Sequence, residues 1–361
     1  MAADPSSVPG IDVAALRSWL VGPGGQDIAG SIRARLLPGG RSNISALVED
    51  EAGARWVVRR PPLGHVMPSA HDMGREFRVL TGLNRAGLPA PQALAMCEDD
   101  QVLGAPFVLM SFVDGRSIDT QAKAEALGAH QASEASAALI DTLAGIHLAD
   151  VEAAGLRQLG KPEGYLGRQA SRWAKQWELT RTRPLAEVDE LRERLQPAIE
   201  SVPDGLPWSL VHGDYRLDNT ILAHDRSQVI AVVDWEMATL GDPVADLAVA
   251  LVYWSQAGDR LREQVPVAEH ITDQAGFWTR AQLVERYAER TGLALDHLDA
   301  CTALAAFKLA VIMESIRYRA LEGQQLGAAA DQAEAMGQAT EALARLGLAV
   351  LEAGTLDGLH S

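Results

Sequence analysis

The segment VHGDYRLDN, residues 211–219, constrains the fold of this chain more than any other feature of its 361 residues. It places His212, Asp214 and Asn219 in the order H-x-D-x-x-x-x-N. Because four residues separate the aspartate from the asparagine, the two side chains can face one cleft from the two ends of a short loop. The segment is therefore a candidate active-site loop.

A second segment, VIAVVDWE at residues 229–236, follows closely along the chain. A β-branched apolar run that ends in an aspartate is typical of a buried strand with a carboxylate at its tip, here Asp234. The intervening AHDRS, residues 223–227, is typical of a hairpin turn. We expect the two strands to present Asn219 and Asp234 near each other.

These residue types match the requirements of phosphoryl transfer. The reaction needs a carboxylate that orients the attacking hydroxyl and accepts its proton, and Asp214 is the candidate. It also needs side-chain oxygens on Mg²⁺, and Asn219 and Asp234 are the candidate ligands. The alternative is structural: Asp214 caps a turn and His212 is a hydrogen-bonded core residue, a role that we favour for His212 alone.

HGDYRLDN followed by VVDWEMATLGDPVADLA resembles the aminoglycoside phosphotransferase superfamily, which shares the protein-kinase fold. The segment WEMATLGDP is similar to the corresponding segment in a subgroup of phosphotransferase domains that are fused to, or encoded near, acyl-CoA dehydrogenases. The resemblance spans about Leu36 to Leu247. It implies an α+β, protein-kinase-like fold of two lobes, with a small antiparallel-sheet N-lobe and a larger, mainly helical C-lobe. It also implies ATP and Mg²⁺ as cofactors.

GDPVADLA has its own local explanation. Asp242 is a good helix N-cap, and Pro243 suits the first helical position. In the resembling family, an aspartate at the position of Asp246 supports the catalytic loop from behind. We interpret Asp242 and Asp246 as structural. Glu236 is left open between a contact with a second metal ion and a contact with the loop alone.

The predicted nucleotide-binding part of the chain departs from the usual kinase pattern. A kinase carries a phosphate-binding lysine on its third strand, but no lysine precedes Lys123 here. Arg59 in RWVVRR is the candidate phosphate ligand, since it lies on a predicted strand ahead of the predicted helix that carries Glu76. The subgroup that the chain resembles also uses an arginine here. The alternative is an Arg59–Glu76 surface ion pair without a ligand.

The turn PGGRSN, residues 38–43, is the candidate phosphate-covering segment. Gly39 and Gly40 permit close backbone approach, and Ser42 or Asn43 could donate hydrogen bonds to phosphate. The turn lacks the G-x-G-x-x-G form of protein kinases, and most Gly-Gly pairs are simple turns.

PFVLMSFVDG, residues 106–115, resembles the hinge between the lobes of a kinase. Met110 would lie behind the adenine, and the backbones of Ser111 and Val113 would bond to its edge. The alternative is an ordinary core strand.

Periodicity and turn residues predict the remaining elements. The first half of the chain alternates short strands with two helices, and the second half is mainly helical. The expected boundary divides residues 1–112 from residues 113–361. Predicted helices cover residues 13–20, 70–86, 131–148, 168–180, 186–200 and 328–353, and predicted strands lie within residues 32–59, 92–98 and 106–113, with a turn at 98–101.

The overall composition disfavours certain classes of binding partner and indicates a cellular location. A net charge of −16 disfavours nucleic acid and anionic membranes. No apolar run is long enough to span a bilayer, and MAADPSSVPG does not resemble a secretion signal, so we expect a cytoplasmic location. Two cysteines, Cys97 and Cys301, form no disulfide framework and are predicted to be small buried side chains.

Two functions are compatible with these observations. The first is a kinase that transfers the γ-phosphate of ATP to a hydroxyl of a small molecule. The second is a catalytically weak, nucleotide-binding regulator of pseudokinase type, supported by the missing lysine. The acceptor, whether an aminoglycoside, a hydroxyacyl compound or another alcohol, stays open, as do GTP use and oligomeric state. Candidate acceptor-site residues are Trp173, Trp177, Trp254, Glu314, Arg317 and Tyr318, and Arg216 and Asp218 are expected to be solvated.

Overall fold

The computed structural model describes residues 8–37, 43–62, 72–225, 227–267, 271–322 and 330–360. The chain divides into two compact units. The first contains Met1–Gly115, Glu152–Leu159 and Ile230–Glu236, and the second contains the remaining segments. The predicted boundary between residues 112 and 113 divides the sequence at a single point, whereas each compact unit contains three segments. That boundary stays a prediction.

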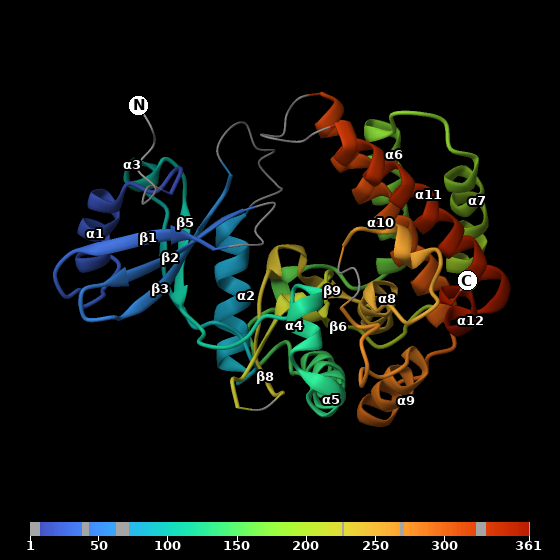
Figure 1. Ribbon diagram of the computed structural model, residues 1–361, viewed down its shortest axis with the longest axis horizontal. Helices are drawn as coiled ribbons and strands as arrows, with labels where there is room; N and C mark the ends of the chain where they lie inside the picture. The colour runs from blue at the N-terminus through green and yellow to red at the C-terminus, as the bar shows by residue number, and fades with distance from the viewer. Residues whose placement is uncertain are drawn as a thin grey trace. The chain divides into compact units, whose positions relative to one another are not determined.

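The first unit is built on a five-stranded antiparallel sheet (Figure 1). Its strand order is β1-β2-β3-β5-β4, and the β2–β3 register places Ser45 opposite Arg59. The turn between β2 and β3 is closed by Asp50, which accepts hydrogen bonds from the backbones of Ala52 and Ala54, and Gly53 adopts the positive φ that the turn requires. The strands are β1 Ile32–Leu36, β2 Ile44–Asp50, β3 Arg55–Arg60, β4 Ala93–Cys97 and β5 Phe107–Ser111.

The α-helices in the described part of this unit are α1 Val13–Val21, α2 Met73–Arg85 and α3 Asp100–Leu103. Asp12 caps α1 and Asp72 caps α2 through side-chain hydrogen bonds to the first-turn backbone. Helix α2 packs against β4 and β5, and α1 contacts β1. The turn predicted at residues 98–101 was partly wrong, because Asp99 caps the short helix α3 there.

The second unit is mainly helical. Its central element is α8, Pro243–Tyr253, in which every residue is buried. A helix whose residues are all buried is stable only inside a core, and α10, Leu298–Leu321, packs against α8. The other described helices of this unit are α4 Gln121–Glu125, α5 Gly128–His147, α6 Tyr165–Thr180, α7 Ala186–Glu200, α9 Arg280–Thr291, α11 Ala330–Ala353 and α12 Thr355–Leu359.

Short strands carry the loops of this unit. Strand β6, Ser209–Val211, pairs antiparallel with β9, Thr239–Gly241. Strand β7 is Thr220–Leu222. Strand β8, Val229–Val232, leads into the segment Ile230–Glu236, which belongs to the first unit. The predicted helix cap is confirmed: Asp242 accepts a hydrogen bond from the backbone of Val244, and Pro243 occupies the first turn.

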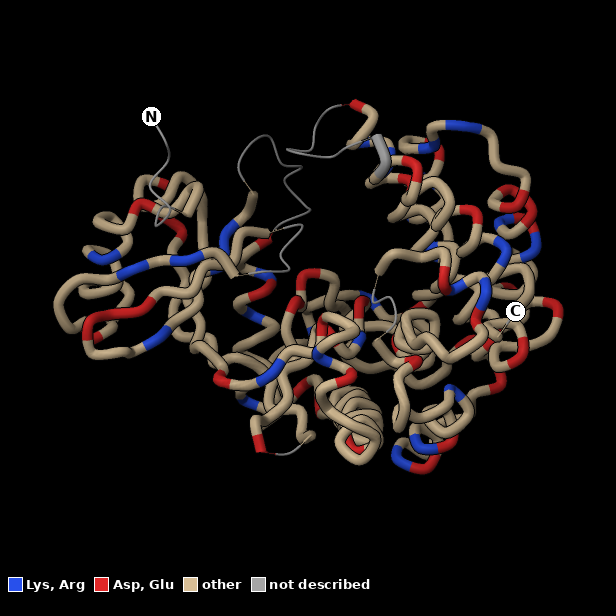
Figure 2. Tube along the Cα trace, viewed as in Figure 1, with Lys and Arg blue, Asp and Glu red and all other residues tan. Residues whose placement is uncertain are grey.

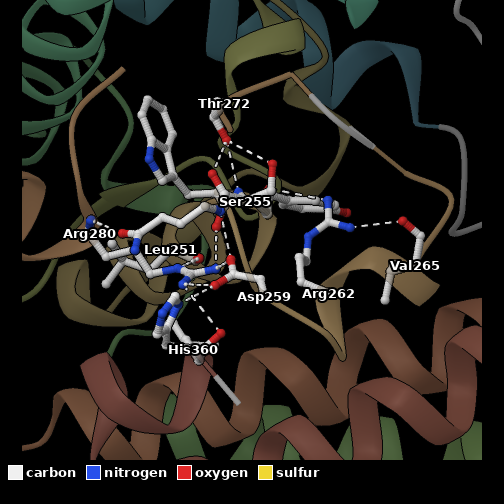
Figure 3. Close-up of polar contacts among 12 residues, drawn as sticks. Leu251, Ser255, Asp259, Arg262, Val265, Thr272, Arg280 and His360 are labelled. Carbon is white, nitrogen blue, oxygen red and sulfur yellow. Dashed lines mark hydrogen bonds and ion pairs between the residues drawn. The ribbon is translucent and has the colours of Figure 1, made fainter. Parts of the chain in front are cut away.

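A buried ion pair fixes the C-terminal end of α8 (Figure 3). Arg280 donates to Asp259 at 2.5 Å and also to the carbonyls of Leu251 and Trp254. The imidazole of His360 lies 2.8 Å from a carboxylate oxygen of Asp259. These contacts tie Arg280 at the start of α9, and His360, to the C-terminal end of α8.

Charged residues of both signs are interspersed along the chain (Figure 2). Among the described residues, no helix is long and apolar enough to cross a membrane.

Candidate active site

Arg59 on β3 gathers three carboxylates in the first unit. Its Nε lies 3.0 Å from a carboxylate oxygen of Glu76 on α2, and its Nη2 pairs with Asp234. The same nitrogen lies 3.6 Å from Glu236. Only 10% of the Arg59 side chain is exposed, so these contacts form in a poorly hydrated setting. The structure thus brings together Arg59, Glu76 and Asp234, which the sequence singled out separately.

Burial governs the electrostatics of this cluster. Desolvation would lower the pKa of Arg59, but the charges of Glu76, Asp234 and Glu236 raise that pKa above its ordinary value. Burial raises the pKa of Glu76, and the charge of Arg59 opposes that shift. The guanidinium is therefore cationic, and its positive charge offsets the electrostatic repulsion among the three neighbouring carboxylates.

Asp234 has an unusual backbone. Its φ is 67°, in the left-handed region that non-glycine residues rarely adopt. It follows the end of β8 directly after Val233, and Trp235 beside it is fully buried. Such a conformation costs about 1–3 kcal/mol and persists only where the surroundings impose it. The backbone is thus held in a shape that aims the carboxylate at Arg59.

The other predicted nucleotide residues are placed as follows. Asn43 is buried, and its amide donates to Glu236 at 2.9 Å. Met110 is buried on β5. The backbone N–H of Ser111 donates to the carbonyl of Gln92 at 2.9 Å, and Val113 is half-buried. Their roles toward adenine stay predictions. Gly39, Gly40 and Ser42 lie outside the described residues.

The loop after β6 is held from behind by Asp246 on α8. The Asp246 carboxylate accepts hydrogen bonds from the backbone N–H groups of His212 at 2.6 Å and Gly213 at 2.8 Å. His147 on α5 lies 3.3 Å from the same carboxylate. His212 is fully buried, and its Nδ1 accepts the Asp214 N–H at 3.2 Å. His212 therefore braces the loop, as the sequence favoured.

This bracing presents Asp214 and Asn219 to each other. The Asn219 amide donates to the Asp214 carbonyl at 2.9 Å and to its carboxylate at 3.2 Å. Because the amide nitrogen faces Asp214, the amide oxygen of Asn219 faces away from it. One side chain of the pair is a carboxylate that can accept a proton, and the other leaves an oxygen for a cation.

Asp246 makes stability depend on pH. Burial alone would raise the pKa of Asp246, but hydrogen bonds and charge from His147 and His212 hold that pKa below its ordinary value of 3.8. A depressed folded-state pKa contributes stability above the unfolded value, and this stability is lost as the pH falls through the folded value. We therefore expect the free energy of unfolding to fall below about pH 4.

Urea unfolding from pH 7 down to pH 2 tests this expectation. Asp246→Asn should lose about 3 kcal/mol at pH 7, because three hydrogen bonds to a charged acceptor are weakened, and should show a shallower acid dependence. Asp141→Asn, which alters a partly exposed carboxylate paired with Arg286, is the matched control. An acid profile of Asp246→Asn that parallels the native profile would contradict the assignment.

Lys308 on α10 was not singled out from the sequence. It is 7% exposed, and its Nζ donates to the carbonyl of Gly213, directly before Asp214. Its ammonium also lies 5.9 Å from the ring centre of Trp173. Burial lowers the pKa of Lys308, while Asp214 and Asp246 oppose that shift. The only local signal was a lysine inside an apolar helical run, FKLAVIM.

The expectation that Arg216 and Asp218 are solvated was wrong. Their side chains are 19% and 15% exposed, and they bond to each other at 2.5 Å. Arg216 also stacks on Tyr253 of α8, with its guanidinium carbon 5.0 Å from the ring centre. Packing against the buried helix removes these loop residues from water.

Several candidate acceptor-site residues make structural contacts, and their role toward an acceptor stays a prediction. Trp173 and Trp177 are buried on α6, as a packing stripe would be. Glu314 accepts hydrogen bonds from the backbone and hydroxyl of Thr182, and Arg317 donates to the Ala333 carbonyl. These contacts hold the helices of the second unit together.

Known proteins resemble this chain along most of its length. It is 32% identical to mouse acyl-CoA dehydrogenase family member 10 over 342 residues, which cover 92% of this chain and 30% of that protein. It is also 32% identical to chicken acyl-CoA dehydrogenase family member 11, over 90% of this chain and 41% of that protein. The chain thus spans well under half the length of these relatives.

Solved structures show the same fold. A putative aminoglycoside phosphotransferase from Ralstonia eutropha superposes with a TM-score of 0.77 at 28% identity, covering 94% of this chain and 98% of the other. Macrolide 2'-phosphotransferase from Brachybacterium faecium gives a TM-score of 0.54 at 20% identity, covering 90% and 97%. The predicted α+β, kinase-like fold is confirmed.

The family comparison covers most of the chain. The sequence model described as "Phosphotransferase enzyme family" matches residues 33–283, more than two thirds of the chain. The match includes the loop with Asp214 and Asn219 and the cluster around Arg59. The chain belongs to the phosphotransferase enzyme family.

Proposed function

We propose that the protein transfers the γ-phosphate of ATP to a hydroxyl of a small molecule, with Mg²⁺ as cofactor. One observation supports this most strongly: Asp214 and Asn219 are bonded to each other in a loop that Asp246 braces through two backbone amides. A preorganised carboxylate of this kind is what a hydroxyl acceptor needs.

Asp214 has the catalytic role in this proposal. Its carboxylate orients the acceptor hydroxyl and takes its proton as the oxygen attacks the γ-phosphorus. Arg59 contacts the α- and β-phosphates, with Glu76 behind it. Gly39, Gly40, Ser42 and Asn43 would cover the phosphates, and Met110, Ser111 and Val113 would surround adenine, as the sequence predicts.

The proposed Mg²⁺ ligands are the two that the sequence predicts, Asn219 of the second unit and Asp234 of the first. The Asn219 amide nitrogen donates to Asp214, which leaves its carbonyl oxygen as a ligand, and Asp234 would supply a carboxylate. Oxygen ligands of this type are those that Mg²⁺ prefers. When bound, the ion would offset the negative charge of the phosphates.

The names of related proteins support the choice of ligands. Aminoglycoside phosphotransferase structures with this fold are complexes with ADP and hygromycin B, and with GDP and kanamycin. The longer relatives are named as acyl-CoA dehydrogenase family members. We therefore propose a hydroxyacyl compound as the acceptor class, and we include GTP as a competing donor in the test.

The test is acceptor-dependent ADP release. Wild-type protein and Mg²⁺ are combined with ATP, with or without competing GTP, and with hydroxyacyl thioesters, free hydroxy acids and aminoglycosides, and the phosphorylated product is identified by mass spectrometry. We expect transfer to at least one hydroxyl and none with Asp214→Asn. Tight ATP binding without transfer to any acceptor would favour the nucleotide-binding regulator instead.

Lys308 gives a second prediction. Lys308→Met leaves the Gly213 carbonyl without its donor and lets the loop shift, so kcat should fall about 100-fold while the KM for ATP stays near the native value. Lys308→Arg should retain most of the turnover. Lys175→Met, at an exposed position on α6, is the control. Equal turnover of Lys308→Met and Lys175→Met would contradict this role.

A further inference from the structure

A second group of chemically reactive side chains lies apart from the catalytic loop. The carboxylate of Asp242, the imidazole of His297 and the thiol of Cys301 have ligand atoms that all lie within 4.8 Å of one another. All three side chains are buried or nearly so: Asp242 is 8% and Cys301 1% exposed, and the His297 side chain is 9% exposed. All three belong to the second unit.

The fold positions these groups through two packed helices. Asp242 caps α8 with Oδ1, which accepts the Val244 N–H at 2.9 Å. Its other oxygen, Oδ2, lies 2.8 Å from His297 Nε2. His297 directly precedes α10, and the Cys301 N–H donates to the His297 carbonyl at 3.1 Å. One helical turn therefore places the imidazole and the thiol on the same side of α10, and α8 packs against α10.

We propose that Asp242, His297 and Cys301 bind one Zn²⁺ ion. The donor set of one sulfur, one nitrogen and one oxygen matches the borderline-soft character of zinc, and it does not match Mg²⁺ or Ca²⁺, which take oxygen ligands. In tetrahedral zinc, bonds of about 2.0–2.3 Å place ligand atoms roughly 3.3–3.7 Å apart. Here Asp242 Oδ2 and His297 Nε2 are 2.8 Å apart and all three ligand atoms lie within 4.8 Å of one another, so small side-chain shifts suffice to reach that range.

Binding requires a defined movement of protons. The Cys301 side chain is 1% exposed and stands among protein groups, so its sulfur is taken to carry its thiol proton before metal binds. Zinc binding breaks the S–H bond, forms the S–Zn bond and releases that proton to solvent. The 2.8 Å contact between His297 Nε2 and the Asp242 carboxylate needs a proton on Nε2, so binding of zinc through Nε2 would move that proton to Nδ1. One proton should therefore leave for each ion bound.

The position of the site indicates what the ion would do. Asp242 lies one helical turn before Asp246, whose carboxylate holds the backbones of His212 and Gly213. An ion between Asp242, His297 and Cys301 would join the start of α8 to the start of α10 behind the catalytic loop. The proposed site is thus a structural clamp, and it does not depend on the phosphotransferase reaction.

Cobalt provides the test, because Co²⁺ replaces Zn²⁺ in such sites and reports sulfur ligation by absorption. Full-length protein treated with EDTA is titrated with Co²⁺ alone. We expect one Co²⁺ per chain, a thiolate-to-cobalt charge-transfer band and tetrahedral d–d bands. Zn²⁺ should displace the cobalt, and a weakly buffered titration should show release of about one proton per ion.

Two cysteine variants make the test specific. Cys301→Ser should lose the charge-transfer band and bind Zn²⁺ at least about 100-fold more weakly. Cys97→Ser removes the other cysteine, which is buried on β4, and should keep the band. His297→Gln keeps the thiol and should also bind Zn²⁺ more weakly. Asp242 is left intact because it caps α8.

The outcomes separate this site from the nucleotide site. A cation bound by Asn219 and Asp234 has oxygen ligands and gives no thiolate band. Absence of the band in wild-type protein overturns the zinc proposal and leaves the phosphotransferase proposal intact. A band that persists in Cys301→Ser also overturns it. Circular dichroism of each variant verifies folding, and His297→Gln decides the matter if Cys301→Ser does not fold.

Discussion

Asp214→Asn is expected to lower kcat for phosphoryl transfer by about 1,000-fold, within the range that loss of a general base produces. Asparagine has nearly the same shape and can still accept the hydrogen bond from Asn219, so the loop should keep its conformation. It cannot accept the proton of the acceptor hydroxyl. ATP affinity, measured by calorimetry, should stay close to the native value, because the loss concerns the transition state alone.

The matched control for this experiment is Asp225→Asn. Asp225 is an exposed aspartate in the turn that follows β7, so its replacement removes the same charge without touching the loop. Native turnover in Asp214→Asn would refute the role of Asp214. A parallel loss in Asp225→Asn would show that the effect arises from net charge.

Arg59→Met is expected to destabilise the protein by about 3–5 kcal/mol, the cost of leaving a buried charge without its partner. Glu76 is 3% exposed and loses its cation, while Asp234 and Glu236 are left facing each other. The same change should weaken ATP binding, since Arg59 is the proposed phosphate ligand. Urea unfolding measures the first effect and calorimetric titration measures the second.

Two further variants identify the cause. Arg55→Met removes an exposed arginine from the same strand, whose pair with Asp114 should contribute at most about 1 kcal/mol. In Arg59→Met/Glu76→Gln the buried carboxylate is neutralised, so the destabilisation should be smaller than the sum of the two single changes. Additive losses, or an Arg59→Met variant as stable as Arg55→Met, would contradict the proposed coupling within the cluster.

Local sequence patterns predicted the elements well. The helix predicted over residues 186–200 is α7, Ala186–Glu200, and the tail predicted as helical contains α11, Ala330–Ala353. Asp242 and Pro243 begin α8 as expected. These predictions depend on interactions between residues only a few positions apart, such as caps and apolar periodicity, so the sequence itself contains them.

The motif also indicated which side chains to examine. Asp214 and Asn219 lie close together because five positions along one loop leave little choice. The supporting role of Asp246 followed from resemblance to a family, and the structure shows its two hydrogen bonds to the loop backbone. In these cases the short spacing along the chain, or a known family pattern, was enough to predict the contact without knowledge of the tertiary structure.

Tertiary structure alone decided the contacts between distant segments. It placed Asp234 and Glu236 against Arg59, brought the Lys308 ammonium to the carbonyl of Gly213, and paired the largely buried Asp218 side chain with Arg216. The residues next to a lone lysine in an apolar helix, or next to an aspartate in a polar loop, do not indicate which distant residue that side chain will contact. Which side chains meet depends on how helices pack and which surfaces exclude water. Those are properties of the assembled core, and residue order determines them only through the whole fold.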